Sequence, residues 1–253
     1  MTTAKLDAYF KSILDIEGFA AVDSSMNGLQ VDNDGGDVSH IAFALDASLE
    51  TISRAAACGA GLLFVHHGLY WGAPIPIKGY FRRRIQCLLE NNIALYAVHL
   101  PLDQHPSVGN NAALAEMLGI EVLEPFGLYH GRLVGYMGRL KQALTLQEAV
   151  ARIAIEGHTP LGVYPFGKAV NETCAVISGG AAREALQALD AGVDLYVTGE
   201  SSHEIYHPIL EGGMNMIAGG HYATEIWGMR KFMALCASHI EEAVEFIDVP
   251  TGL

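Results

Sequence analysis

Short apolar segments alternate with amphipathic segments of helical period along most of this chain, and this alternation limits its fold more than any other feature. In the N-terminal half, predicted strands at residues 39–45, 62–65 and 93–98 are separated by predicted helices at 49–58 and 81–89. Parallel strands need crossover connections of this length, whereas antiparallel strands can be joined by a tight turn. The sequence therefore predicts an α/β fold with parallel or mixed sheets flanked by helices.

The same order recurs in the C-terminal half. Predicted strands cover residues 133–140, 174–177, 195–197 and 214–218, with predicted helices at 112–118, 146–155 and 182–189. The Gly- and Pro-bearing stretch Gly119 to Gly131 is the expected boundary between an N-terminal domain, 1–125, and a C-terminal domain, 126–253. The last helix, about 222–239, and the last strand, 244–249, can pack back on the first domain.

One passage of the chain resembles another. GAGLLFVHH, from Gly59 to His67, aligns without gaps on GVDLYVTGE, from Gly192 to Glu200, and an Ala-rich helix and an apolar strand precede each. This similarity indicates two similar, interlinked α/β domains. Equivalent strand ends would then carry His66 and His67 in one half and Gly199 and Glu200 in the other.

Composition excludes several classes of protein. No apolar run reaches the roughly 18 to 20 residues of a membrane-spanning helix, and residues 1–19 have the pattern of an amphipathic helix rather than a signal peptide. We therefore expect a cytoplasmic protein. A net charge of −13 argues against nucleic acid as a partner. The 51% hydrophobic content favours a chain that buries additional surface in a homo-oligomer.

The four cysteines are far apart in the sequence and form no Cys-x-x-Cys pair, so we expect buried free thiols. They are Cys58, Cys87, Cys174 and Cys236.

Histidines and carboxylates gather instead at predicted strand ends. His66 and His67 close one strand, and because successive strand side chains point to opposite faces, this pair is better suited to two metal ions than to one. In GGHYATE, His221 and Glu225 are four residues apart at the start of a helix and so share one face. The two carboxylate oxygens of Glu225 can bridge two ions.

In HLPLD, His99 and Asp103 flank Pro101, which favours a turn at that point. Asp103 is a predicted metal ligand, whereas His99 either binds a metal or hydrogen-bonds a ligand. In TGESSHE, Glu200 or His203 is a candidate catalytic acid or base, although the same residues can simply cap a helix. A nitrogen and oxygen ligand set without thiolate suits Zn²⁺, Mn²⁺, Fe²⁺ or Ni²⁺. The alternative is that all these polar residues cap strands and helices and bind nothing.

Four motifs in this order, VHHGLYWG, HLPLDQHP with GNN, TGESSHE and GGHYATE, resemble those of the YbgI-like dinuclear metal-centre proteins, also called GTP cyclohydrolase 1 type 2 homologues. The resemblance covers nearly the full chain. It implies a two-domain subunit in a toroidal homohexamer, with paired metals facing an inner cavity. The usual His-Thr-x-x-Asp pattern reads His-Leu-Pro-Leu-Asp here, so one hydroxyl contact is lost while both end residues remain.

Carried over to this sequence, the resemblance implies that one ion is held by His66, His221 and Glu225 and the other by His67, Asp103 and Glu225.

We expect a metal-dependent hydrolase acting on a phosphate ester or a nucleotide or purine-type substrate. Tyr70 and Trp71 would form an aromatic wall for a planar group. Two alternatives remain open: a non-enzymatic metal-handling or regulatory ring scaffold, and a protein whose ions only tie its two halves together.

Overall fold

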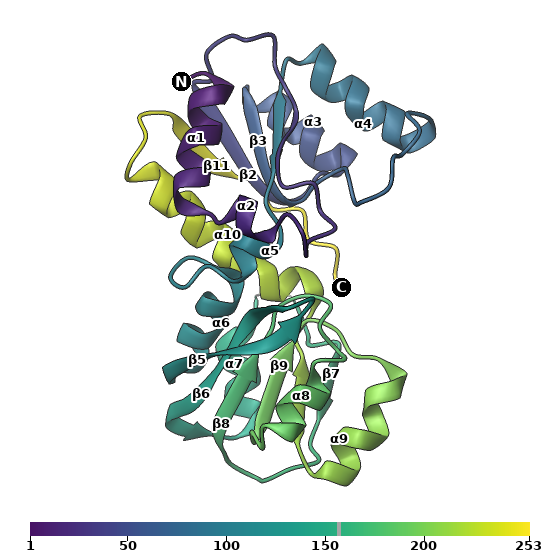
Figure 1. Cartoon of the computed structure of the whole chain (residues 1–253), viewed down its shortest axis with the longest axis vertical. Coiled ribbons are helices and arrows are strands. Elements are labelled where there is room, and N and C mark those ends of the chain that lie inside the picture. The colour runs from purple at the N-terminus through teal and green to yellow at the C-terminus, as the bar shows by residue number, and fades with distance from the viewer. Residues whose placement is uncertain (156–157) are drawn as a thin grey trace. The chain divides into compact units, whose positions relative to one another are not determined.

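A computed structural model describes residues 1–155 and 158–253 and divides the chain into two compact units. The first unit comprises Met1–Leu102 and Met229–Val249, and the second comprises Asp103–Gly228 and Pro250–Leu253. Each unit is a β-sheet covered by helices (Figure 1). The short helix α5 (Leu100–Asp103) and the long helix α10 (His221–Ala237) continue from one unit into the other. The predicted pair of interlinked α/β domains is confirmed.

The first unit contains a five-stranded sheet with the order β1-β4-β3-β2-β11. Its strands are β1 (Gly28–Val31), β2 (His40–Asp46), β3 (Leu62–His67), β4 (Ala94–Ala97) and β11 (Ala243–Phe246). Its helices are α1 (Thr3–Ile13), α2 (Ile16–Phe19), α3 (Leu49–Ala57) and α4 (Gly79–Glu90). All strands except β1 run parallel, and β11, the last strand of the chain, pairs with β2.

Both faces of this sheet are buried. Phe43, Phe64 and Tyr96 occupy matching positions on three adjacent strands and pack on Phe10 of α1 and Phe232 of α10. The aliphatic residues that alternate with them face α3 and α4, which cover the opposite side (Figure 1). Burial of each large side chain stabilises the folded state by about 1.5–3 kcal/mol. Because both faces of the sheet are buried, these strands contain continuous apolar runs.

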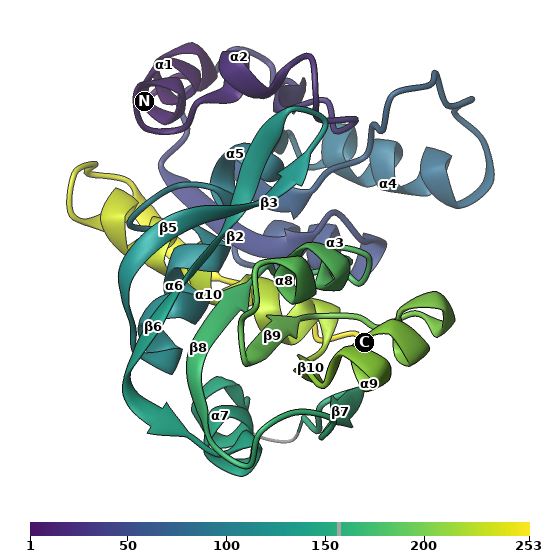
Figure 2. The same cartoon turned by 60° about the horizontal axis from the view of Figure 1, so that its bottom comes forward.

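The second unit contains a six-stranded mixed sheet with the order β5-β6-β8-β9-β10-β7 (Figure 2). Its strands are β5 (Ile120–Tyr129), β6 (Arg132–Leu144), β7 (Gly162–Tyr164), β8 (Asn171–Val176), β9 (Leu195–Thr198) and β10 (Asn215–Ala218). Its helices are α6 (Asn110–Leu118), α7 (Leu146–Ile153), α8 (Ala185–Asp190), the 3-10 helix η1 (His203–Ile205) and α9 (Tyr206–Gly212). Strands β8, β9 and β10 run parallel to one another. The pairs β5–β6, β6–β8 and β7–β10 are antiparallel.

The two units share a topology. Each has three consecutive parallel strands joined by helices, β2-α3-β3-α4-β4 in the first and β8-α8-β9-α9-β10 in the second. In each, the strand that precedes this core, β1 or β7, pairs antiparallel with its third strand. Strands β3 and β9 are therefore equivalent, as the alignment of GAGLLFVHH with GVDLYVTGE predicts. This order supports an internal duplication.

Two segments differ from expectation. Residues 119–131, expected as a domain boundary, instead contain the whole of β5, which pairs with β6 in the second sheet. The compact units divide between Leu102 and Asp103. The amphipathic segment 1–19 is two helices, because Asp15 caps a new helix by accepting the Gly18 N–H. The other predicted strands and helices are confirmed, with ends shifted by a few residues. Among the described residues, no helix is both long and apolar enough to span a bilayer.

Candidate metal centre

Three histidines lie together at the carboxyl ends of β3 and β4 in the first unit: His66, His67 and His99, here called the histidine set. The ring centroid of His66 lies 4.7 Å from that of His67 and 5.0 Å from that of His99. One ring nitrogen from each residue lies within 4.8 Å of the other two. Parallel strands end at one edge of the sheet, which is where open α/β sheets bind ligands.

Hydrogen bonds fix the orientation of the two adjacent rings. The Nδ1 atom of His66, a fully buried residue, is 2.9 Å from the backbone oxygen of Val98. The Nδ1 atom of His67 is 2.8 Å from Oδ1 of Asp46, which ends the neighbouring strand β2. A carbonyl or ionised carboxylate oxygen can only accept, so each Nδ1 carries the proton and each Nε2 offers its lone pair. Metal-binding histidines have this arrangement.

The third ring, that of His99, is held by a buried carboxylate from the N-terminal loop. Its Nδ1 lies 2.9 Å from Oδ1 of Asp23, whose side chain is 1% exposed. The other Asp23 oxygen accepts from Leu100 N and from Asn27 Nδ2. Burial raises the pKa of Asp23, but the hydrogen bond and charge of His99, with bonds from Asn27 and Ser25, outweigh it and leave the pKa below its usual value. Asp23 is therefore an ionised anchor for His99.

One of the two predicted aromatic residues lies beside the histidine set. The Trp71 ring centroid is 4.9 Å from that of His99 and 5.9 Å from that of His67. Tyr70 packs edge to face on Phe81 at 5.6 Å, against the hydrophobic core. The expectation that Tyr70 and Trp71 form one wall is therefore wrong, because the two neighbouring side chains take different directions.

In the second unit, Asp103, Glu225 and His221 form a group that we call the carboxylate set. Asp103 is 5% exposed, and its Oδ1 accepts from Asn110 Nδ2 at 2.8 Å and from Ser178 Oγ at 3.0 Å. Both bonds go to one oxygen of a carboxylate that accepts at about four positions, and they help to orient Asp103. Burial of an acidic group without such partners would be costly.

His221 lies between two carboxylates. Its Nδ1 is 2.6 Å from Glu200 Oε1, and its Nε2 is 3.2 Å from Oε2 of Glu225, which is 3% exposed. Burial lowers the pKa of His221, but hydrogen bonds and charges from Glu225 and then Glu200 outweigh it and raise the pKa to about 10. The metal-free protein therefore holds a proton at this position, between two acidic groups that also favour a metal cation.

The loop after β8 approaches this pair closely. Gly179 has φ +64°, and a Cβ atom at this residue would lie 2.1 Å from Glu225 Oε1. Its N–H donates to Thr224 Oγ1, and its carbonyl accepts from the backbone N–H of Gly199 and Glu200. A glycine is required here for both its backbone conformation and its lack of a side chain.

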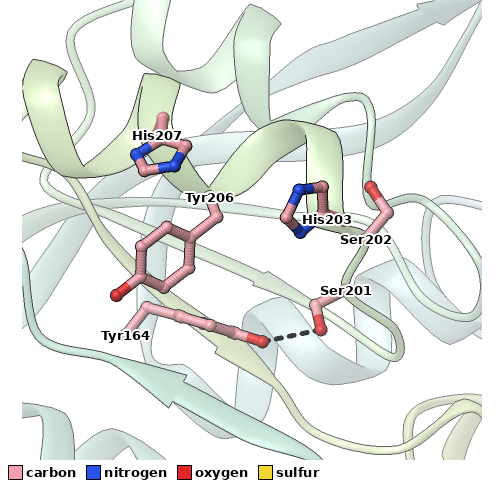
Figure 3. A pocket seen from close by; sticks show the side chains of 6 residues that line it. All are labelled: Tyr164, Ser201, Ser202, His203, Tyr206 and His207. Carbon is pink, nitrogen blue, oxygen red and sulfur yellow. Dashed lines mark hydrogen bonds between the residues drawn. The ribbon is translucent and has the colours of Figure 1, made fainter.

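The two predicted catalytic residues have different surroundings. Glu200 hydrogen-bonds Nδ1 of His221, so its observed contact positions that ring. His203, at the start of η1, is exposed and lines a pocket of about 530 Å³ (Figure 3). The pocket is lined by Tyr164, Ser201, Ser202, His203, Tyr206 and His207. The hydroxyl of Tyr164 donates to Ser201 Oγ at 2.7 Å, which joins β7 to the loop after β9.

Two residues that hydrogen-bond the histidine set, Asp46 and Asp23, were not identified from the sequence. Asp46 could have been identified because it ends a strand parallel and adjacent to β3. Asp23 lies in an irregular segment 76 residues from His99 along the chain, and no local motif connects them. His105, the second histidine of the HLPLDQHP motif, has an Nδ1 that accepts the backbone N–H of Ser107 and Val108, so it caps a turn.

The donor atoms of the two sets are imidazole nitrogens and carboxylate oxygens. They are largely buried, and the histidines are presented through Nε2 by hydrogen bonds at Nδ1. This chemistry fits Zn²⁺, Mn²⁺, Fe²⁺ or Ni²⁺.

Comparison with known proteins identifies the family. The chain is 38% identical over 286 residues to the "GTP cyclohydrolase 1 type 2 homolog" of Treponema pallidum (strain Nichols), covering 100% of both chains. It matches the solved structure of the protein ybgI with 33% identity and a TM-score of 0.91, and a solved protein of Thermus thermophilus with 36% identity and a TM-score of 0.89, each covering 100% of both chains. The family model DUF34/NIF3 (NGG1p interacting factor 3) matches residues 1–251, and the chain therefore belongs to the DUF34/NIF3 family.

Proposed function

We propose that the histidine set and the carboxylate set together hold two divalent metal ions, and that the protein is a metal-dependent hydrolase. The family resemblance assigns His66, His221 and Glu225 to one ion, and His67, Asp103 and Glu225 to the other. Chain connectivity supports this grouping, because His99 and Asp103 are four positions apart in the sequence and such a segment spans at most about 14 Å.

The proposal rests on one observation: in four histidines, Nδ1 lies within hydrogen-bond distance of an oxygen acceptor. His66 contacts a backbone carbonyl, and His67, His99 and His221 contact carboxylates. Such contacts fix the tautomer and increase the basicity of Nε2. His105 is a useful contrast, because its Nδ1 accepts backbone N–H groups, so its Nε2 carries the proton and offers no lone pair.

A divalent ion held by these residues would supply an acidic water and a Lewis acid for a phosphoryl or carbonyl oxygen. The chain's own residues then have separate tasks in the proposal. Asp46, Asp23 and Glu200 hold the imidazoles in place. His203, exposed in the pocket of Figure 3, moves protons, and Trp71 offers a ring face to a planar group. The name of the Treponema pallidum relative supports a nucleotide or purine-type substrate. Another phosphate ester is the second substrate class in this proposal.

Elemental analysis of the purified protein tests the metal part. We expect about two divalent ions per chain, a marked loss in Glu225→Gln and no change in Glu211→Gln, an exposed control on α9. The Gln variant keeps the side-chain volume, and circular dichroism checks that each variant is folded. One ion or none in the folded wild type would contradict the two-ion centre.

Assays with p-nitrophenyl phosphate and GTP test the enzymatic part. We expect turnover that requires added Zn²⁺, Mn²⁺, Fe²⁺ or Ni²⁺ and that is lost in Glu225→Gln. Two bound ions without product from either substrate class would favour the non-enzymatic scaffold. If metal removal dissociates or unfolds the protein and neither substrate is turned over, the result would favour a structural role in which the ions only tie the two halves of the chain together.

A further inference from the structure

A second group of residues with side chains that can bind a metal lies near the amino ends of β2 and β11 in the first sheet. His40 begins β2, Cys58 is the C-cap residue of α3, and Glu245 lies in β11. One donor atom from each residue lies within 4.8 Å of the other two. We propose that His40, Cys58 and Glu245 bind one zinc-class divalent cation, separate from the histidine and carboxylate sets.

The strand pairing fixes two of these residues. In the parallel pair of β11 with β2, Ala243 is opposite His40 and Glu245 is opposite Ala42. Residues two apart on a strand share a face, so the side chains of His40 and Glu245 are diagonal neighbours on one face of the sheet. Cys58 packs against the hydrophobic core on that same face, which α3 covers.

A hydrogen bond turns the His40 ring toward the glutamate. Its Nδ1 lies 3.1 Å from the backbone oxygen of Cys58, so Nδ1 carries the proton and Nε2 has the lone pair. Nε2 is 3.7 Å from Glu245 Oε2. This separation is too long for a good hydrogen bond. It is close to the distance of about 3.4 Å between two ligands of one tetrahedral zinc ion with bonds near 2.1 Å.

The thiol of Cys58 adds the soft ligand. Its Sγ donates to the Ala55 carbonyl at 3.2 Å, and the residue is only partly buried. Burial and the charge of Glu245 raise the pKa of the Cys58 thiol, so without a cation it is not a reactive thiolate. A cation placed between Cys58 and Glu245 would offset the repulsion between their negative charges.

The ligand chemistry and the position distinguish this site from the proposed two-ion centre. It combines nitrogen, oxygen and sulfur, and thiolate favours zinc over magnesium, calcium or manganese. Three protein ligands leave a fourth position for water, as in exchangeable rather than closed zinc sites. The side chains of His40 and Glu245 are 19% and 53% exposed, so an ion can reach them. His40 and Asp46 lie at opposite ends of β2, about 20 Å apart at ~3.3 Å per residue.

The site would also have a structural effect, because its ligands come from β2, from the end of α3 and from the last strand of the chain. An ion bound to all three would cross-link β11, an edge strand of the sheet, to β2 and to the end of α3. Binding to the folded state alone stabilises that state by RT ln(1 + c/Kd), where c is the free ion concentration, so the effect grows with the ion concentration relative to Kd.

Cobalt titration of the metal-free full-length protein tests the proposal, because Co²⁺ replaces Zn²⁺ and absorbs in the near ultraviolet when a thiolate binds it. We expect this thiolate band in the wild type and its removal by added Zn²⁺. Cys58→Ser should lack the band. Cys87→Ser, which changes another partly buried cysteine on α4, should keep it. The two proposed ions have no cysteine ligand, so the band reports on this site whether or not the two-ion centre exists.

Two further variants test the three-ligand arrangement. His40→Gln and Glu245→Gln should each weaken the Co²⁺ affinity measured by the thiolate band at least about 10-fold, while circular dichroism shows a folded protein. The proposal is overturned if the wild type gives no thiolate band, if the band survives in Cys58→Ser, or if either Gln variant binds Co²⁺ as tightly as the wild type.

Discussion

In the carboxylate set, burial disfavours the charged side chains, whereas nearby polar and charged groups stabilise them. Glu225 and Asp103 are nearly inaccessible, yet their oxygens face an imidazole, an amide and a hydroxyl rather than apolar groups. Buried charges are tolerated only when they are paired in this way. In the metal-free protein the proton on His221 provides part of that pairing, which makes stability depend on pH.

The direction of this dependence follows from the pKa of His221. The pKa is raised from 6.5 to about 10 in the folded state, because Glu225 and Glu200 outweigh the effect of burial. Its contribution to stability is therefore complete below pH 6.5 and is lost as the pH rises to about 10. We expect the melting temperature of chelator-treated protein to fall more steeply over this range than that of His221→Gln. Parallel melting curves for the two proteins would contradict the assignment.

Individual loops also determine whether the ligands can take their positions, and the loop after β8 is the clearest case. Gly179→Ala should cost about 1–2 kcal/mol of stability through its left-handed backbone and should also displace Glu225, because the new Cβ overlaps Oε1. We expect metal binding to weaken at least about 10-fold in isothermal titration.

Gly192→Ala is the matched control for this loop. Gly192 has φ +71° and no atom within 4 Å of an added Cβ, so its variant has the same backbone strain without the overlap. Both variants should be destabilised, and only Gly179→Ala should lose metal affinity. Equal metal affinities in the two variants would show that the approach of Gly179 to Glu225 is unimportant.

Most elements of this fold were predictable because their signals are local. Strand β3 is an apolar run of the expected length, and α7 begins with the capping box of Thr145 and Glu148. Strand β5 was missed because its glycine and proline resemble a linker, while pairing with β6 makes it a strand. The pairing with β6 therefore determines the conformation of this segment, although its local composition predicts a linker.

The same distinction applies to the sites. His66 and His67 close a predicted strand, and His221 and Glu225 lie at the start of a predicted helix, so the proximity within each of these two pairs could be predicted. Contacts that join distant segments could not, such as that of Asp23 with His99. The group of His40, Cys58 and Glu245 is a further case, because the pairing of β11 with β2 brings residues from opposite ends of the chain together. The cysteine spacing predicted a buried thiol there, whereas Cys58 is only partly buried.

For the molecule as a whole, the second unit carries an apolar surface that its own sheet does not cover. Beyond the pairing of Tyr136 with Val176, β5 and β6 continue as a two-stranded ribbon, here residues 126–135. On it Leu128, Tyr129 and Leu133 are 56%, 37% and 41% exposed. Exposed apolar side chains grouped on one element are typical of a protein contact. We propose that this ribbon binds a second copy of the chain and helps to form the homohexamer expected from the family resemblance.

Light scattering tests this proposal. We expect the wild type to have a mass near six times that of the 27.1 kDa chain, and the double variant Leu128→Glu/Leu133→Lys to have a lower mass at the same concentration. The two residues are paired across the ribbon, so opposite charges preserve the strand pairing while making the surface polar. Leu210→Glu, at an exposed apolar position on α9, is the control that should keep the wild-type mass. A monomeric wild type, or a double variant that keeps the wild-type mass, would show that the ribbon does not hold the copies together.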